Sequence, residues 1–208
     1  MVIGNWYLVF GTFPISSFLP LSLVPSTEHR SPFFGNMNLE YIEQSKEIYY
    51  NAELEYQRYY FDEGAGGFVL VHSEHNLNDS ERFVAEVLAK MGKRVILLSE
   101  RAAEGVKTPD ANIDGEVWEF KELTQETANL KDRVQDGLRD ARRKGAMVVV
   151  YHINRDEYDV KKINAGIQRA LEWDVNYQIQ SMMWIDRSGE TQTISRQEWM
   201  DGKRVERF

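Results

Sequence analysis

The spacing of apolar residues predicts strands and helices that alternate from residue 66 onward. Short runs rich in Val, Ile and Leu are separated by stretches in which apolar residues recur every three or four positions, as on one face of a helix. The predicted strands cover 68–72, 94–99, 147–151, 178–185 and 191–196, with a hairpin at 109–121 and helices at 78–91, 127–144 and 160–171. Helices packed against a sheet can bury the apolar faces of this many strands. The sequence therefore predicts an α/β or α+β fold with a mixed sheet flanked by helices.

The ends of two predicted helices carry recognisable signals. Asn78 and Glu81 occupy the two positions of a capping box at the start of the first helix. Gly92 and Gly145 follow the last apolar residues of their helices, where a left-handed backbone is common. These residues predict where the two helices begin and end.

The first 65 residues differ from the rest of the chain. Residues 1–37 are apolar and broken by prolines, so we interpret them as a loosely ordered leader rather than a signal peptide or a membrane helix. Residues 38–65 are rich in Glu and Tyr and are predicted to form a helical extension. Three glycines within 63–67 favour a turn, and we expect a nuclease-like catalytic domain at 66–208.

Composition restricts the chemistry that the chain can perform. The chain has no cysteine, which excludes disulfides and thiolate metal sites and leaves oxygen or imidazole ligands for any metal. A formal net charge of −8 argues against a broad basic surface for nucleic acid, so binding must rely on local basic clusters. Without a signal peptide, we expect a cytoplasmic location and no membrane partner.

The hairpin brings charged residues together. Asp114-Gly115 favours a two-residue turn in which both residues have positive φ. This turn pairs Asp110 with Glu119 across the two strands, with their side chains on one face. Lys121 shares that face because side chains alternate along a strand, whereas Trp118 and Phe120 point to the other face. We predict that Asp110, Glu119 and Lys121 converge and that Asp114 lies at the turn tip, away from them.

Two facing carboxylates need a compensating cation. Mg²⁺ or Mn²⁺ suits an oxygen-ligand pair of this kind, and such a metal lowers the pKa of bound water and stabilises charge on a phosphate. Lys121 supplies a further cation. The sequence therefore indicates a metal-dependent nuclease with Asp110 and Glu119 as ligands. The simpler interpretation is a surface strand with a Glu119–Lys121 salt bridge.

An Asp on one strand followed by Glu-x-Lys on the next resembles the PD-(D/E)XK nucleases, here over residues 80–152. A closer resemblance, over residues 66–200, is to the C-terminal tRNA-nuclease domains of CdiA-type contact-dependent inhibition toxins. It rests on Gly67-Phe68-Val69-Leu70-Val71-His72, on the helix leading to Gly92, and on Lys107-Thr108-Pro109-Asp110-Ala111 running into Trp118-Glu119-Phe120-Lys121. The resemblance implies a nuclease that acts on RNA, tRNA in particular, and a cognate immunity or antitoxin protein.

Other polar residues are secondary candidates. His72 and His75 could act as acid–base groups, and Glu81 could reach the metal, although its capping-box position explains it equally well. Four basic residues near the end of the helix at 127–144 could bind phosphate or simply favour the negative end of the helix dipole; they are Arg139, Arg142, Arg143 and Lys144.

Two other functions stay open. One is a metal-independent ribonuclease in which His72 or His75 acts with Lys121 and the ribose 2′-OH is the nucleophile. The other is a non-catalytic binding module whose Tyr-rich segment at 38–61 contacts a protein partner, since interfaces are enriched in tyrosine.

Overall fold

The computed structural model describes residues 32–101 and 108–208. Residues 1–31 of the predicted leader at 1–37 therefore lie outside the described residues. Lys107, which precedes the hairpin, lies outside them too. Along the chain the elements are α1 Pro32–Tyr50, β1 Tyr56–Phe61, β2 Phe68–His72, α2 Asp79–Lys90, β3 Arg94–Leu97, β4 Ala111–Ile113, β5 Glu116–Thr124, α3 Leu130–Arg143, β6 Val148–Asn154, α4 Val160–Glu172, β7 Ser181–Asp186, β8 Thr191–Ser195 and α5 Arg196–Met200.

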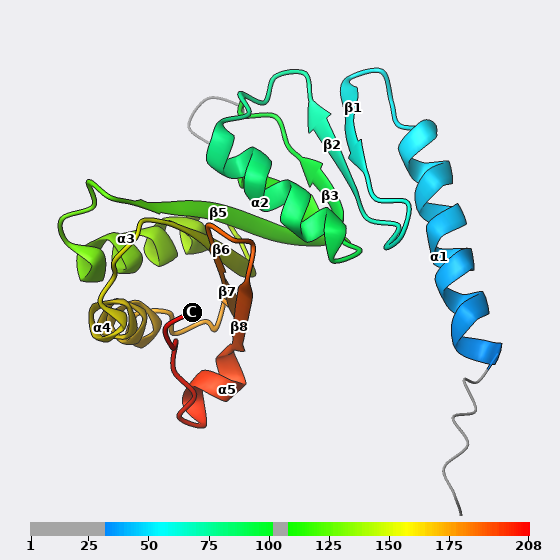
Figure 1. Ribbon diagram of the computed structural model, residues 1–208. Helices are drawn as coiled ribbons and strands as arrows, with labels where there is room; N and C mark the ends of the chain where they lie inside the picture. The colour runs from blue at the N-terminus through cyan, green and yellow to red at the C-terminus, as the bar shows by residue number, and fades with distance from the viewer. Residues whose placement is uncertain (1–31, 102–107) are drawn as a thin grey trace, which may run out of the picture.

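All eight of these strands form one mixed sheet, in which spatial order follows sequence order (Figure 1). The pairs β2/β3, β5/β6 and β6/β7 are parallel, because a helix connects the two strands of each pair. The remaining neighbours are antiparallel. The predicted α/β class, with a mixed sheet flanked by helices, is confirmed, as is the predicted order of helix, three strands, helix and strand from α2 to β6.

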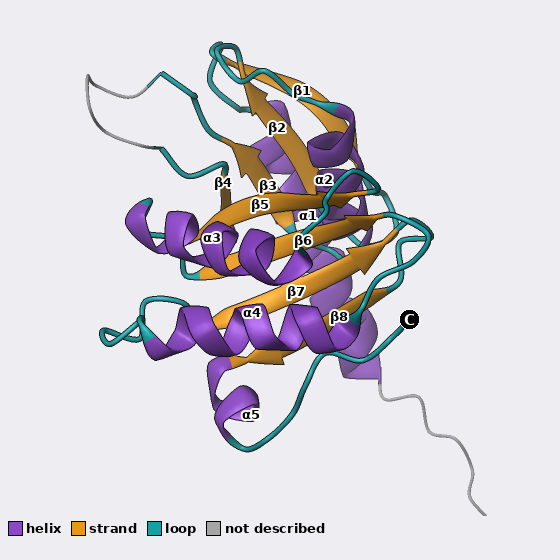
Figure 2. Ribbon diagram, turned by 90° about the vertical axis from the view of Figure 1, so that its left-hand side faces the viewer, coloured by secondary structure: helices purple, strands orange, loops and turns teal. Residues whose placement is uncertain are grey.

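Helices cover both faces of the sheet, and the alternation of side chains along each strand decides which core a residue joins. On one face, α2 packs against residues that include Phe120 and Val150. On the opposite face, α3 and α4 lie side by side over β5–β7 (Figure 2) and bury Val149, Tyr151 and Trp184. Neighbouring residues of β6 thus belong to different cores. No helix within 32–101 or 108–208 combines the length and apolar character needed to span a membrane.

The helix-end signals are confirmed. The Asn78 side chain accepts a hydrogen bond from the Glu81 amide, and the Glu81 carboxylate accepts one from the Asn78 amide. Gly92 and Gly145 follow α2 and α3 with φ of 84° and 78°. The short helix α5, which begins at the N-cap Ser195, was not predicted, and it too is closed by a capping box.

The Tyr-rich segment differs from the predicted helical extension. α1 ends at Tyr50, and residues 56–61 form β1, which pairs antiparallel with β2. Four of the six residues of β1 are aromatic, a composition that favours strands, and the free edge of β2 gives β1 a partner. The Tyr49 ring packs on Phe68 of β2. At least part of this segment therefore packs within the sheet, and the glycines at 63–67 join two paired strands.

Candidate active site

The β4–β5 hairpin has the predicted register. Ala111 pairs with Trp118 and Ile113 with Glu116. At the tip, Asp114 and Gly115 have φ of 52° and 89°, so both are left-handed as the turn requires. The Asp114 carboxylate accepts hydrogen bonds from Lys93 Nζ at 2.9 Å and from the Arg94 amide at 3.1 Å. Asp114 thus belongs to the turn, as predicted.

Asp110 and Glu119 lie on either side of one ammonium group. Lys144 Nζ is 3.2 Å from Asp110 Oδ1 and 2.7 Å from Glu119 Oε1. The other oxygen of Asp110 accepts a hydrogen bond of 2.7 Å from the Phe120 amide, which fixes the carboxylate against β5. The predicted convergence of the two carboxylates is therefore present, with a lysine side chain between them.

Lys121 lies on the same face, as predicted. Its Nζ is 2.5 Å from Glu119 Oε1 and 3.5 Å from Asp140 Oδ2 on α3. Trp118 and Phe120 are buried on the opposite side of β5, in the core beneath α2. The simpler interpretation, an exposed Glu119–Lys121 pair on a surface strand, does not describe this arrangement, because the exposed fraction of Glu119 is 0%. We call Asp110, Glu119, Lys121, Asp140 and Lys144 the carboxylate–lysine cluster.

The ionisation of the cluster reflects its burial. Burial and the nearby charge of Asp110 raise the pKa of Glu119 above its ordinary value, although Lys121 and Lys144 act in the opposite direction. Burial lowers the pKa of Lys144, but its hydrogen bond to Glu119 and the charge of Asp110 outweigh this effect, so the pKa is raised. Lys144 is therefore charged at neutral pH, and the two lysines support the ionised form of Glu119.

The end of α3 places Lys144 in the cluster. Lys144 is the C-cap, and the left-handed Gly145 then turns the chain so that the Ala146 amide bonds to the Ala141 carbonyl at 3.0 Å. Lys144 was predicted as a phosphate-binding residue, and Asp140 was not predicted. Asp140 and Lys144 lie four residues apart on one helix face, a spacing that could have indicated a polar stripe beside the apolar one.

His75 lies beside the cluster. It lines an open hollow of about 470 Å³ together with Asp110, Lys144, Asp140 and Glu100. Its Nδ1 donates to the Leu98 carbonyl at 2.7 Å, and its Nε2 is 3.4 Å from the Glu81 carboxylate. Burial lowers the pKa of His75, but the interactions with Glu81 and Leu98 outweigh it, and the pKa is raised.

The other secondary candidates lie apart from these contacts. His72 accepts a hydrogen bond from the Glu74 amide at 3.1 Å and lies 3.9 Å from Glu55. Glu81 closes the capping box and pairs with His75; within the described ranges no hydrogen bond or ion pair joins it to Asp110 or Glu119.

The three arginines of the predicted basic cluster do not share the contacts of Lys144. Arg139 pairs with Asp136 at 2.9 Å, Arg142 donates to the backbone carbonyl of Trp173, and Arg143 is exposed. The structure thus separates Lys144 from its three basic neighbours.

The cluster has the donor set that a hard cation needs. Glu119 Oε2 is buried and has no hydrogen-bond partner in the described part of the chain, and three carboxylates face two lysines. Within the same residues, no group of three or more His, Asp or Glu side chains is arranged around a metal position. Mg²⁺, however, is often held by one or two carboxylates together with substrate phosphates. Asp110 and Glu119 are ligands of the right type for such an ion, but Lys144 Nζ lies between them, so an ion shared by both carboxylates requires this ammonium to move aside.

The residues of the carboxylate–lysine cluster lie within a range that matches a known protein family. Residues 107–191 match the family of contact-dependent growth inhibition CdiA C-terminal domains. This part of the chain is similar to CdiA C-terminal domains. The matched range is less than half of the chain, but it contains the whole hairpin, α3 and α4, and hence every residue of the carboxylate–lysine cluster. The resemblance to CdiA seen in the sequence is confirmed, and the family name indicates a domain that inhibits growth.

No curated protein matches the chain. One solved structure that matches is described as a CdiA-CT/CdiI toxin and immunity complex from Burkholderia pseudomallei. It is 20% identical, the match covers 56% of this chain and 81% of that one, and the TM-score is 0.40. At this level of similarity, the match carries no information about the activity of this chain.

Proposed function

We propose that the chain is a nuclease that cleaves phosphodiester bonds in RNA at the carboxylate–lysine cluster. One observation carries the proposal: Asp110, Glu119 and Lys121 converge on one face of the hairpin, and Glu119 is buried with one oxygen unpartnered. Burying an ionised carboxylate costs free energy unless an opposite charge lies beside it. Buried ionisable groups next to specific charge partners are frequent in active sites, and Glu119 with its two lysines is such a group.

Asp110 and Glu119 would hold a divalent ion, Mg²⁺ or Mn²⁺. Such an ion lowers the pKa of a bound water and offsets charge on the phosphate. The lysines perform the remaining tasks. Lys121 Nζ, already paired with Glu119, can donate to a phosphate oxygen as negative charge develops there. Lys144 Nζ, which lies between the two carboxylates, moves aside when the ion binds and remains available to a phosphate oxygen.

We propose RNA rather than DNA because the chain resembles the tRNA-nuclease domains of CdiA-type toxins. A domain that inhibits growth by cleaving RNA, tRNA in particular, would act in the cytoplasm, and the producing cell would need protection. We therefore propose RNA as substrate and a cognate immunity protein as partner.

The test is cleavage by the purified full chain. We expect cleavage of RNA in the presence of Mg²⁺ or Mn²⁺, inhibition by EDTA, and loss of activity in Asp110→Asn, which keeps the size of the side chain but removes its charge. Asp114→Asn, in the same hairpin, is the matched control and should retain activity. Absence of cleavage of both RNA and DNA with either ion would contradict the proposal, as would full activity of Asp110→Asn.

The pH dependence of cleavage should depend on Lys144. Glu119 must be ionised to act as a ligand, and its pKa is raised, so activity should rise with pH through that raised value. In Lys144→Met, Glu119 loses a hydrogen bond and a positive charge that lower its pKa. The acid limb of the pH–rate profile should therefore move to higher pH, whereas Lys131→Met, at an exposed position of α3, should leave it in place. A shift to lower pH would refute this role for Lys144.

A second mechanism is favoured by the position of His75. This histidine lines the same hollow as Asp110 and Lys144, and its pKa is raised. In a metal-independent ribonuclease, the 2′-hydroxyl gives its proton to solvent as its oxygen attacks phosphorus, the bond to the 5′-oxygen breaks, and the leaving oxygen takes up a proton, for which we propose His75 as the donor. RNA cleavage that survives EDTA, yields a 2′,3′-cyclic phosphate and is lost in His75→Ala would establish this mechanism.

A further inference from the structure

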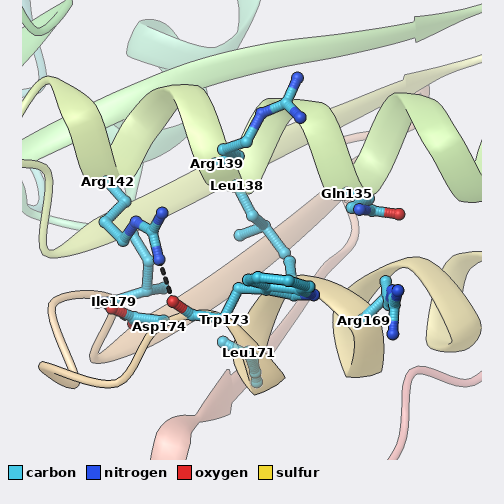
Figure 3. A pocket seen from close by; sticks show the side chains of 10 residues that line it. Gln135, Leu138, Arg139, Arg142, Arg169, Leu171, Trp173, Asp174 and Ile179 are labelled. Carbon is cyan, nitrogen blue, oxygen red and sulfur yellow. Dashed lines mark hydrogen bonds between the residues drawn. The ribbon is translucent and has the colours of Figure 1, made fainter.

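A second hollow lies between α3 and α4 (Figure 3). Its volume is about 250 Å³. Leu138 and Ile179 are among the apolar residues of its lining, and three arginines surround it: Arg139 and Arg142 from α3 and Arg169 from α4. The indole of Trp173 lies between Arg142 and Arg169 in the close view. We call this hollow the α3–α4 pocket.

Trp173 is unusual among the tryptophans of the described ranges. Its exposed fraction is 62%, whereas Trp118, Trp184 and Trp199 are buried. The backbone of Trp173 is fixed, because it forms the C-cap of α4 and its carbonyl accepts a hydrogen bond from Arg142. The Arg169 guanidinium lies 5.6 Å from the centre of the ring. The pocket therefore presents a large, exposed aromatic surface on a fixed backbone, with the Arg169 guanidinium beside it.

The arginines can exchange their present partners. Arg139 pairs with Asp136 at 2.9 Å and Arg169 with Glu172 at 3.4 Å, both as exposed pairs three residues apart on a helix. Exposed pairs of this kind contribute little to stability, whereas an arginine can bind a phosphate through two parallel hydrogen bonds. The pocket lining thus carries three arginines beside Asp174, and Arg139 and Arg169 become available to a phosphate when they leave Asp136 and Glu172.

We propose that the α3–α4 pocket binds an unpaired nucleotide of the substrate, with the base stacked on Trp173 and the adjoining phosphates held by Arg139 and Arg169. The inference rests on the proposed function, because Arg139 and Arg142 precede Lys144 on the same helix. Arg139 and Lys144 are separated by about 7.5 Å along the axis of α3 but lie on different faces of the helix, so a strand that reaches both sites must pass around α3. Stacking on a protein ring requires a base that is free of its own helix. The substrate class is therefore single-stranded or looped RNA.

Binding can be measured without cleavage. A fluorescent 2′-O-methyl RNA oligonucleotide in EDTA is resistant to both mechanisms considered above, so the full wild-type chain can be used. Stacking on an aromatic side chain contributes enough that its loss should weaken binding about 5- to 100-fold. We expect this loss in Trp173→Ala, near-normal binding in Trp173→Phe, and no change in Tyr50→Ala, an exposed aromatic on α1.

A salt titration tests the arginines separately. Removing one phosphate contact to a single strand should reduce the slope of log affinity against log salt by about 0.7. Arg169→Ala should show this reduction. Arg82→Ala, which removes an equally exposed arginine with a partner three residues away on α2, should not.

The outcomes separate this inference from the proposed function. Equal affinity of Trp173→Ala and Tyr50→Ala for the oligonucleotide would overturn the pocket even if the chain cleaves RNA. Concentration-dependent dimerisation that Trp173→Ala abolishes, with oligonucleotide binding intact, would overturn it too and assign the surface to a second copy of the chain. Binding that depends on Trp173 in a chain without cleavage activity would support the pocket and contradict the nuclease.

Discussion

Replacing Lys121 with Ala should lower kcat for RNA cleavage by about 10²- to 10³-fold, the effect of removing one group that stabilises charge in a transition state. Lys121 Nζ is held between Glu119 at 2.5 Å and Asp140 at 3.5 Å, so the position that we propose for it beside the phosphate is restricted by two ion pairs. KM should change much less, because the interaction strengthens only as charge develops. The measurement is steady-state cleavage of a labelled RNA.

Two controls distinguish catalysis from folding. Lys121→Met keeps most of the aliphatic stem and should show the same loss of kcat, with circular dichroism and thermal unfolding close to those of the wild type. Lys131→Ala removes an exposed lysine from α3 and should retain full activity. A Lys121→Ala protein that is folded and fully active would remove Lys121 from the mechanism.

Replacing Gly137 with Ala should destabilise the protein, although the same change in an exposed helix stabilises by up to about 1 kcal/mol. A Cβ at this position would lie 2.5 Å from the Tyr151 hydroxyl and 3.4 Å from Lys121 Cγ. Tyr151 is fully buried and its hydroxyl donates to the Val134 carbonyl at 2.8 Å, so it has no room to yield. Overpacking of this kind costs about 1–3 kcal/mol. We expect a lower free energy of unfolding in urea and a lower Tm.

The clash can be tested by a double-mutant cycle. Tyr151→Phe alone should cost about 1 kcal/mol through its lost hydrogen bond. Combined with Gly137→Ala, it removes the atom that the new methyl group meets, so the double mutant should be less destabilised than the sum of the two single mutants. Gly64→Ala, where the nearest atom would be 3.4 Å away, is the control. Strict additivity would show that the Tyr151 hydroxyl does not limit the approach of α3 to the sheet.

The sequence alone determined those features that depend on residues close together in the chain. Asp114-Gly115 fixes the register of the hairpin because its turn type admits little else, and this register places Asp110, Glu119 and Lys121 on one face. The capping residues of α2 and the periodicity of the apolar residues likewise predict elements from local interactions. For the same reason, the composition of the Tyr-rich segment was misleading: whether residues 56–61 extend a helix or join a sheet depends on the free edge of β2, which no local pattern contains.

The tertiary structure decided which groups surround the hairpin. Asp140 and Lys144 reach Lys121 and Glu119 because α3 packs closely on β5 at Gly137, and His75 joins them from the segment before α2. The same packing buries Glu119 and raises its pKa, a property of the surrounding volume rather than of the residue. The α3–α4 pocket also exists only where two helices meet. Turn chemistry and periodicity act over a few residues, whereas burial and charge act through space.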